Sequence, residues 1–305
     1  MPNPFLQAFN GRSNRFAKSR LVAGAFMISF SGVWVKICHV TPVASAFYRV
    51  LFGGLFLLAA ALIKQEIRWL KWRHALLGLF CGLFFSVDLI CYHYSIRYIG
   101  PGLGTILPNF QVFILAVVGA LLLKERVRMI AILSMPVAIG GLFLIVGLDW
   151  SQLDRLYKIG IYFGLGAAVF YSIFLLSLRK LQAEQKGRSI FHVLMVVSLT
   201  SAALIALELY WRGDTFRIPD WRSLWSLAAL GLFSQAIGWI FISNALPHVR
   251  ASLSGLILLL QPALAFVWDV LIFARPTSLT NWIGLAVVLA AIYLGTTGTL
   301  PIRRR

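Results

Sequence analysis

The sequence predicts an all-helical membrane protein with ten transmembrane helices, arranged as two inverted five-helix repeats. Three observations lead to this fold class: the composition, the spacing of the apolar stretches, and the distribution of Lys and Arg. Of the 305 residues, 60% are hydrophobic and 12% are charged, against roughly 45–50% and about 25% in soluble domains. The mean hydropathy is +0.84. This composition excludes a soluble enzyme, a disordered chain and a disulfide-stapled secreted domain.

Apolar stretches long enough to cross a bilayer recur along the whole chain. A hydrocarbon core about 30 Å thick needs roughly 20 apolar residues in a helix. Short connectors between the stretches leave no room for a soluble catalytic domain. The predicted spans are Leu21–Cys38, Val43–Ile63, His74–Ile96, Gly102–Leu123, Met129–Gly147, Lys158–Leu178, Ile190–Trp211, Leu224–Ser243, Ala251–Phe273 and Leu279–Thr299.

Proline and glycine mark several of the helix ends between these spans. Breaks are predicted at Thr41-Pro42, Gly100-Pro101-Gly102, Leu246-Pro247 and Arg275-Pro276. The first span followed by Ala44-Ser45-Ala46 resembles a signal peptide with its cleavage site. Because polar residues intervene and the apolar run is of span length, the first span is expected to be retained.

The distribution of basic residues predicts the orientation. With the N-terminus in the cytoplasm, the inside segments hold 19 Lys and Arg and the outside segments hold 8, and Arg49 lies within a span. Loops rich in Lys and Arg stay in the cytoplasm. Both termini are therefore expected inside, as basic tails at 1–20 and 300–305. The net charge of +18 then reflects topology and indicates no nucleic-acid partner.

The two halves of the chain are weakly similar to each other. A shift of 150 residues places Leu103, Gln111, Val117 and Leu121 on Leu253, Gln261, Val267 and Leu271. Each half holds an odd number of spans, so the second copy must enter the membrane upside down. Inverted repeats around a midplane site are typical of secondary transporters. The predicted repeats are residues 21–148 and 158–299.

Several short motifs resemble the EamA family of the drug/metabolite transporter superfamily. They are Pro42-Val43-Ala44 with Arg49, Asp88-Leu89, His93-Tyr94-Ser95-Ile96-Arg97-Tyr98, Leu123-Lys124-Glu125-Arg126 and Ile283-Gly284-Leu285. The resemblance covers nearly the whole chain. It implies an exporter of amino acids or other small metabolites that carries no ATP-hydrolysing part. The family often repeats the acid of Glu125 in the second half, where this chain has Arg275-Pro276.

Ionisable residues inside spans are costly and need a reason. Arg49 and Asp88 lie at similar depths, about 9 and 12 Å from the outer ends of their spans. They are expected to form a buried pair, which either pins two helices together or opens during transport. Lys36 and Asp269 lie near the outer ends of their spans. Lys36 either extends to the headgroups or closes an outer gate with Asp269.

Two glutamines are the main candidates for a substrate site at the membrane midplane. Gln111 and Gln261 are equivalent in the two repeats, and Pro108 and Pro262 lie near them. They either line a cavity that binds an uncharged or zwitterionic solute or link two helices by a hydrogen bond. Further candidates for the substrate site are Ser86, Tyr92, His93, Trp34, Gln235 and Trp239. His93 either titrates and carries a proton or is a packing residue.

An enzyme is the alternative to a transporter. Ser29-Phe30-Ser31-Gly32 and Ser252-Leu253-Ser254-Gly255 resemble the elbow of an intramembrane serine protease without its first glycine. No metal-ligand cluster, His-Glu-x-x-His motif or phosphate-binding loop is present in the sequence. The prediction is therefore a multi-pass exporter of the bacterial inner membrane, without cofactor or metal. Its partners are a small solute and the lipid bilayer, and it is a monomer or a homodimer. The alternative is a membrane-embedded enzyme acting on a lipid-linked substrate.

Overall fold

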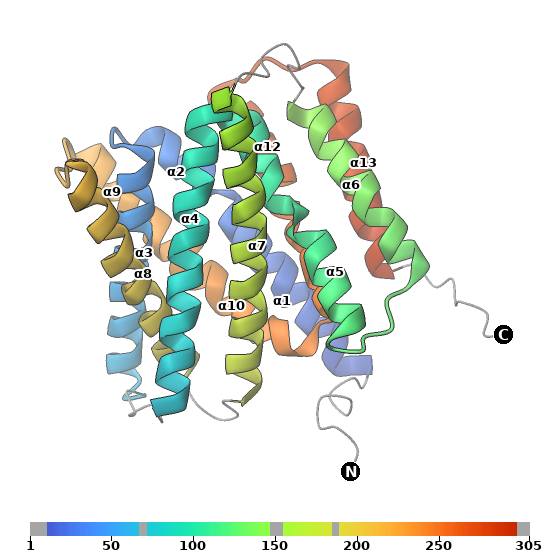
Figure 1. The fold of residues 1–305 in the computed structure, drawn as a ribbon, viewed down its shortest axis with the longest axis horizontal. Helices are drawn as coiled ribbons and strands as arrows, with labels where there is room; N and C mark the ends of the chain where they lie inside the picture. The colour runs from blue at the N-terminus through green and yellow to red at the C-terminus, as the bar shows by residue number, and fades with distance from the viewer. Residues whose placement is uncertain (1–10, 67–71, 147–154, 185–188, 298–305) are drawn as a thin grey trace.

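The structure, a computed structural model, describes residues 11–66, 72–146, 155–184 and 189–297. In this part of the chain every regular element is a helix, and the helices stand side by side between two faces of the molecule (Figure 1). η1 and η3 are 3₁₀-helices and η2 is a π-helix. In chain order the elements are α1 (Gly11–Ser29), α2 (Ser31–Ile37), α3 (Pro42–Ile63), α4 (Trp72–Ile106), η1 (Leu107–Phe110), α5 (Gln111–Leu121), α6 (Met129–Val146), α7 (Arg155–Glu184), α8 (Ile190–Arg212), α9 (Trp221–Ala229), η2 (Leu230–Gly238), α10 (Trp239–Ala245), η3 (Leu246–His248), α11 (Ala251–Leu258), α12 (Leu260–Phe273) and α13 (Leu279–Thr297).

The ten predicted spans are confirmed, because ten stretches of the described chain are long and apolar enough to cross a membrane. The largest differences are at the ends of two spans. α1 begins at Gly11 rather than Leu21, and α7 continues to Glu184 rather than Leu178. Charged residues extend both helices, because Arg, Lys and Glu favour helices and reach the headgroup region with their long side chains. Residues 1–10, 147 and 298–305, which belong to the predicted tails and span ends, lie outside the described residues.

The third and fourth spans differ from the prediction in how they are joined. The assigned helix continues from Trp72 to Ile106, through the predicted break at residues 100–102. The chain nevertheless turns back on itself there. A Cβ on Gly104 would lie 3.0 Å from the Cα of Ile96, whereas eight residues of a straight helix span about 12 Å. The hairpin is therefore so tight that it retains helical hydrogen bonds.

Several spans are interrupted in the middle. In the fourth span η1, which contains Pro108, separates α4 from α5. In the ninth span α11 and α12 are separated at Leu259, close to Pro262. The eighth span contains the π-helix η2. Proline removes a helical hydrogen bond, and π segments are frequent at functional sites. Irregular backbone at such depth is tolerated only where protein or water satisfies it.

Small residues allow helices to pack closely. A Cβ on Gly141 of α6 would lie 2.8 Å from the carbonyl oxygen of Gly284 in α13, and a Cβ on Gly284 would lie 2.6 Å from the carbonyl oxygen of Gly141. Such contacts replace the hydrophobic effect, which does not drive helices together in lipid. On the outside, large apolar side chains such as Leu62, Leu133 and Leu271 are 57%, 61% and 69% exposed. These exposed positions suit contact with lipid tails.

We call the side on which α1 begins and α13 ends the terminal face, and the other side the opposite face. Near the terminal face the Nζ of Lys18 in α1 donates to the carbonyl oxygen of Thr296 in α13, at 2.8 Å. This contact joins the first and the last span. The interior between the two faces holds the residues considered next.

Candidate functional site

Arg49 is the central polar residue of the interior. It lies on α3 and is half-buried, and its Nε donates to Oε1 of Gln235 at 3.2 Å. The Nε2 of Gln235 in turn donates to the Oγ of Ser198 on α8, at 3.1 Å. Gln235 lies in the π-helix η2 and is 2% exposed. Three spans are therefore linked by a chain of hydrogen bonds that begins at Arg49.

The predicted ion pair between Arg49 and Asp88 is not formed. Within the described residues no carboxylate oxygen lies at ion-pair distance from the guanidinium of Arg49, although Asp88 interacts with it electrostatically over a longer distance. The physical reason is the helix packing: α3 packs against α8 and η2 and has few contacts with α4, which carries Asp88. Gln235 therefore accepts the hydrogen bond that the Nε of Arg49 donates. Asp88 is 7% exposed.

The two predicted glutamines lie directly after the breaks in their spans. Gln111 is the first residue of α5 and Gln261 the second residue of α12. Gln111 is 1% exposed. Its Oε1 and the Nε2 of Gln261 have no hydrogen-bond partner among the described residues. The side chain of Gln261 lies near the hydroxyl of Tyr171, whereas no described contact joins the two glutamines to each other. The two glutamines therefore do not bond to each other, but the contact of Gln261 in α12 with Tyr171 in α7 is compatible with a link between helices.

Aromatic residues form one wall of this region. Trp239 is 2% exposed, and its indole packs edge-on against Phe85 and Phe174 at centroid distances of 5.5 and 5.0 Å. Tyr171 lies against the same indole, at 6.3 Å. The Nε1 of Trp239 has no hydrogen-bond partner within the described chain. The predicted residue Trp239 thus lies in the polar interior together with Tyr171.

Three other predicted site residues have local partners. The Nδ1 of His93 lies 2.5 Å from the carbonyl oxygen of Leu89, one turn earlier in α4, and Tyr92 packs edge-on against the His93 ring. The Oγ of Ser86 donates to the carbonyl oxygen of Leu83. These contacts favour a packing role for His93 and Ser86.

Trp34 lies in a different part of the molecule from Trp239. Its ring stacks on Phe233, at a centroid distance of 6.2 Å. It packs against the small buried cluster of Cys38, Leu227 and Leu230, whereas Trp239 belongs to the main core. The two tryptophans therefore do not share one aromatic wall.

The opposite face carries an ion pair between the two halves of the chain. Lys36 of α2 binds Asp269 of α12, and the carboxylate of Asp269 also lies 3.6 Å from Arg275. The ammonium of Lys36 lies 4.7 Å from the ring centroid of Phe273. The side chains of Lys36 and Asp269 are 52% and 22% exposed. Lys36 thus has a specific partner and does more than extend to the headgroups.

A second ion pair between the halves lies on the terminal side, and sequence reasoning missed it. Glu125 follows α5, and its Oε1 accepts from Nη1 of Arg179 at 2.8 Å and from the amide of Ala251 at 2.9 Å. Arg179 belongs to α7, and Ala251 begins α11. The side chains of Arg179 and Glu125 are only 10% and 7% exposed. The sequence signals for these two residues are separate: Glu125 belongs to a motif that resembles the family, and Arg179 is one of the basic residues that predict the orientation.

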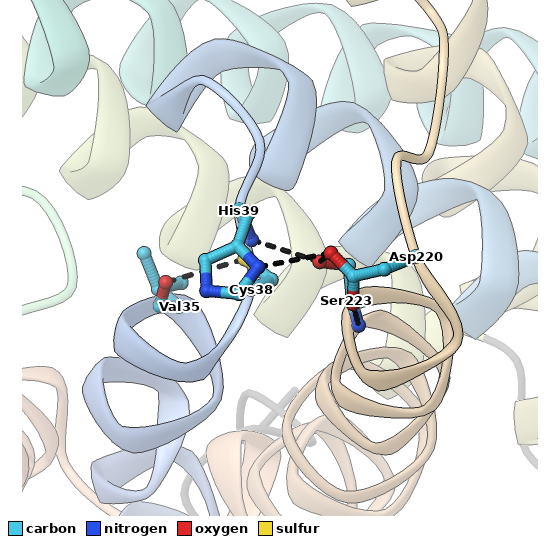
Figure 2. Close-up of polar contacts among 5 residues, drawn as sticks. All are labelled: Val35, Cys38, His39, Asp220 and Ser223. Carbon is cyan, nitrogen blue, oxygen red and sulfur yellow. Dashed lines mark hydrogen bonds and ion pairs between the residues drawn. The ribbon is translucent and has the colours of Figure 1, made fainter.

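A polar cluster at the opposite face fixes the loop between α2 and α3 (Figure 2). Asp220, which precedes α9, caps the helix by accepting from the amide of Ser223 at 2.8 Å, and it lies 2.9 Å from the Nδ1 of His39. The amide of His39 donates to the Oγ of Ser223 at 2.8 Å. These contacts lower the pKa of Asp220 to about 2, first through His39 and then through Ser223. The cluster joins the two halves of the chain at the opposite face.

The cluster predicts a pH-dependent contribution to stability. The folded-state pKa of Asp220 is about 2, below the ordinary value of about 3.9. Its contribution is therefore present above pH ~4 and is lost as the pH falls towards 2. We expect Asp220→Asn, which keeps an N-cap residue but removes the charge, to lower the melting temperature at pH 6. The difference from wild type should shrink at pH 3. A difference that is independent of pH would show that the carboxylate charge is unimportant.

The fold defines a multi-pass membrane protein with a polar interior, and within the described residues no cluster of three or more His, Cys, Asp or Glu is placed to hold a metal ion. The EamA-like transporter family model matches residues 19–147 and again residues 158–297. The chain belongs to this family of transporters, as its motifs implied.

Individual relatives are similar over most of their length. The uncharacterized transporter YwfM of Bacillus subtilis (strain 168) is 25% identical over 259 residues, which cover 83% of either chain. An uncharacterized transporter of Archaeoglobus fulgidus is 24% identical over 284 residues, which cover 93% of this chain and 97% of the relative. One crystal structure superposes with a TM-score of 0.77 at 18% identity and covers 92% of this chain and 96% of its own. It shares the fold.

Proposed function

We propose that this transporter exports a zwitterionic metabolite of the amino-acid class, bound between Arg49 and Asp88 in the middle of the membrane. The observation that carries the proposal is that Arg49 and Asp88 are close enough to interact but do not form an ion pair. Both lie within spans, neither has an ion-pair partner within the described chain, and they act on each other from a distance. Ionisable residues within transmembrane segments commonly mark pathways for substrates or ions.

The donor geometry of Arg49 suits a carboxylate. A guanidinium has five N–H donors in a fixed fork, and only the Nε of Arg49 is hydrogen-bonded within the described residues. Because Gln235 holds this Nε, the other N–H donors of the guanidinium are oriented before a solute binds. A substrate carboxylate would accept two parallel hydrogen bonds from it. The ammonium group of the same solute would then face Asp88.

We propose that further buried groups complete a site of mixed character. Gln111 and Gln261 provide an unpartnered acceptor and donor. Trp239 and Tyr171 provide apolar surface with a polar edge. Ligand sites commonly combine an apolar lining with a few placed polar groups. This combination fits a solute that carries an apolar side chain besides its charged ends.

We further propose that the chain consists of two inverted repeats, 21–148 and 158–299, that move relative to each other around this site. The proposal is supported by the two separate stretches that the family model matches, and by the breaks near Pro108 and Pro262 in equivalent spans. Discontinuous helices at the repeat interface are typical of secondary transporters.

The two ion pairs between the halves are placed to act as the two gates of an alternating-access transport cycle. Glu125–Arg179 lies on the terminal side and Lys36–Asp269 on the opposite side. In each pair, the end of the fourth helix of one repeat binds the end of the first helix of the other. The pair on the terminal side is the more deeply buried. Opening one pair while the other stays closed would expose the site to one side at a time.

Transport by the purified protein in sealed liposomes tests the proposed function. We expect uptake of one or more radiolabelled amino acids that exceeds uptake by empty liposomes and is changed by an imposed pH gradient if protons are coupled. The same solutes should leave the assay chemically unchanged. A panel of amino acids and related zwitterions that gives no uptake above empty liposomes would contradict the proposed substrate class, and chemical conversion of a solute would indicate an enzyme.

The two glutamines provide a prediction at the level of binding. We expect Gln111→Leu and Gln261→Leu each to weaken solute binding by about two- to tenfold, the worth of one hydrogen bond. The melting temperature should be kept, since each side chain has an unpartnered amide atom. Gln182→Leu, which removes another unpartnered amide far from the site, is the matched control. Unchanged affinity in both variants would remove the glutamines from the site.

Orientation in the bacterial inner membrane, with both termini cytoplasmic, is proposed from the charge distribution. We expect a cysteine at Thr215, which is exposed on the opposite face, to react in intact cells with an impermeant thiol reagent. A cysteine at Gln65, exposed on the terminal side, should react only after the membrane is opened. The native cysteines are buried and should give little background. Labelling of Gln65→Cys in intact cells would reverse the orientation.

A further inference from the structure

A small basic cavity lies at the terminal face, away from the proposed substrate site. Its volume is about 70 Å³, several times the roughly 10–15 Å³ that one water molecule requires. Its walls come from both halves of the chain. Lys18 of α1 and Arg128, just before α6, contribute from the first half, and Arg250, Ser252 and Thr296 contribute from the second.

The lining of this cavity has a strong excess of positive charge. Lys18, Arg128 and Arg250 line it, and none of the described residues that line it is acidic. Two of these cations are held by carbonyl oxygens rather than by carboxylates: Lys18 donates to Thr296 at 2.8 Å, and Nη1 of Arg250 donates to Arg126 at 2.6 Å. The pKa of Arg250 is lowered by burial and then by the charge of Arg128. The cations therefore repel one another in a partly dry site.

The acid that acts on Arg250 is already engaged elsewhere. Glu125 acts electrostatically on Arg250, but its Oε1 is already bonded to Arg179 and to the amide of Ala251. Within the described residues Lys18 and Arg250 bond to carbonyl oxygens, and neither lies at ion-pair distance from a carboxylate. An anion placed between them would relieve the repulsion.

A buried hydroxyl provides the second indication of a ligand. Ser252 is 1% exposed and lines the cavity, and its Oγ has no hydrogen-bond partner among the described residues. A buried hydroxyl without a partner costs free energy. Ser252 is also the second residue of α11, and the N-terminus of a helix attracts anions through its amides and dipole.

We propose that this cavity binds a phosphate group, with Lys18 and Arg250 as the charged ligands and the hydroxyl of Ser252 as a neutral donor. Several donors converge from different directions, which suits the tetrahedral oxygens of a phosphate better than a flat carboxylate. The phosphate belongs either to the headgroup of an anionic phospholipid in the adjacent leaflet or to a free phosphate. Binding would tie α1, α11 and α13 together next to the Glu125–Arg179 pair. The proposal does not depend on the identity of the transported solute.

Thermal unfolding of the delipidated protein in a neutral detergent tests this site. One series adds inorganic phosphate, with chloride at equal ionic strength as the control. Another series adds phosphatidylglycerol, with phosphatidylcholine as the control. We expect at least one series to raise the melting temperature of wild type above its control. A rise with phosphatidylglycerol alone assigns the site to a lipid headgroup, and a rise with inorganic phosphate assigns it to a free ligand.

Variants separate the site from a general effect of charge. Arg250→Gln should weaken the stabilising ligand about tenfold or more, as expected when a charge-assisted hydrogen bond is lost. Ser252→Ala, which leaves every charge in place and is not expected to disturb folding, should weaken it severalfold. Lys180→Gln, whose side chain is 64% exposed on the terminal side, should bind as wild type does. The proposal is overturned if neither series stabilises wild type, or if Ser252→Ala binds as tightly as wild type.

Discussion

Replacing Arg179 with methionine is expected to lower the free energy of unfolding by about 3–5 kcal/mol, because it leaves the buried carboxylate of Glu125 without its charged partner. Both side chains are about nine-tenths buried, so water cannot take the place of the guanidinium. The amide of Ala251 would remain as the one bonded donor. The measurement is reversible unfolding in mixed micelles.

A double-mutant cycle shows whether this loss comes from the pair. Arg179→Met together with Glu125→Met should recover most of the stability, because an apolar pair of similar volume often replaces a buried ion pair at little cost. The pair at the opposite face is the matched control. Lys36→Met should cost only about 0–1 kcal/mol, the range of exposed pairs, since Lys36 is 52% exposed. Strictly additive losses at Glu125 and Arg179 would show that the two residues are not coupled.

Arg49→Gln is expected to weaken binding of the transported solute by about 100-fold or more. Two hydrogen bonds to a charged group contribute about 1.5–3 kcal/mol each, and each 1.4 kcal/mol is tenfold in affinity. Arg49→Lys should also bind weakly, because an ammonium keeps the charge but lacks the planar fork that holds a carboxylate. Binding is measured by scintillation proximity with the radiolabelled solute in detergent.

Two comparisons make this result specific. Arg217→Gln, which removes an exposed arginine on the opposite face, should bind the solute as wild type does. Solute analogues that lack the carboxylate should bind wild type and Arg49→Gln equally weakly. Tight binding of the zwitterion by Arg49→Gln would exclude Arg49 as the carboxylate ligand, even if transport were lost.

The span pattern is a local property of this chain, which is why it could be predicted. Each span must be apolar over about 20 residues and satisfy its own backbone hydrogen bonds. A stretch of consecutive residues is therefore enough to determine whether a span forms. The helix ends depend on short signals such as Thr41-Pro42, where the hydroxyl of Thr41 accepts from the amide of Ala44. Differences arose where charged residues extend α1 and α7, because hydropathy marks the membrane boundary and not the end of a helix.

The candidate site was predicted only in part. Sequence reasoning identified Arg49 and Asp88 because ionisable groups inside spans need an explanation. It assigned Arg49 to Asp88 because their depths matched. Depth gives one coordinate along the membrane normal, whereas a partner also depends on which helices are neighbours.

The amino-acid sequence by itself therefore determined the number of spans, the polar residues inside them and the transporter family. Tertiary structure alone decided which of these residues meet: Gln235 with Arg49, Glu125 with Arg179 and Ala251, and three cations around Ser252. The physical reason is that span formation depends on consecutive residues and the bilayer, while these hydrogen bonds join residues 54 to 186 positions apart, such as Arg179 with Glu125 and Arg49 with Gln235. Only the packing of helices against one another brings such residues together.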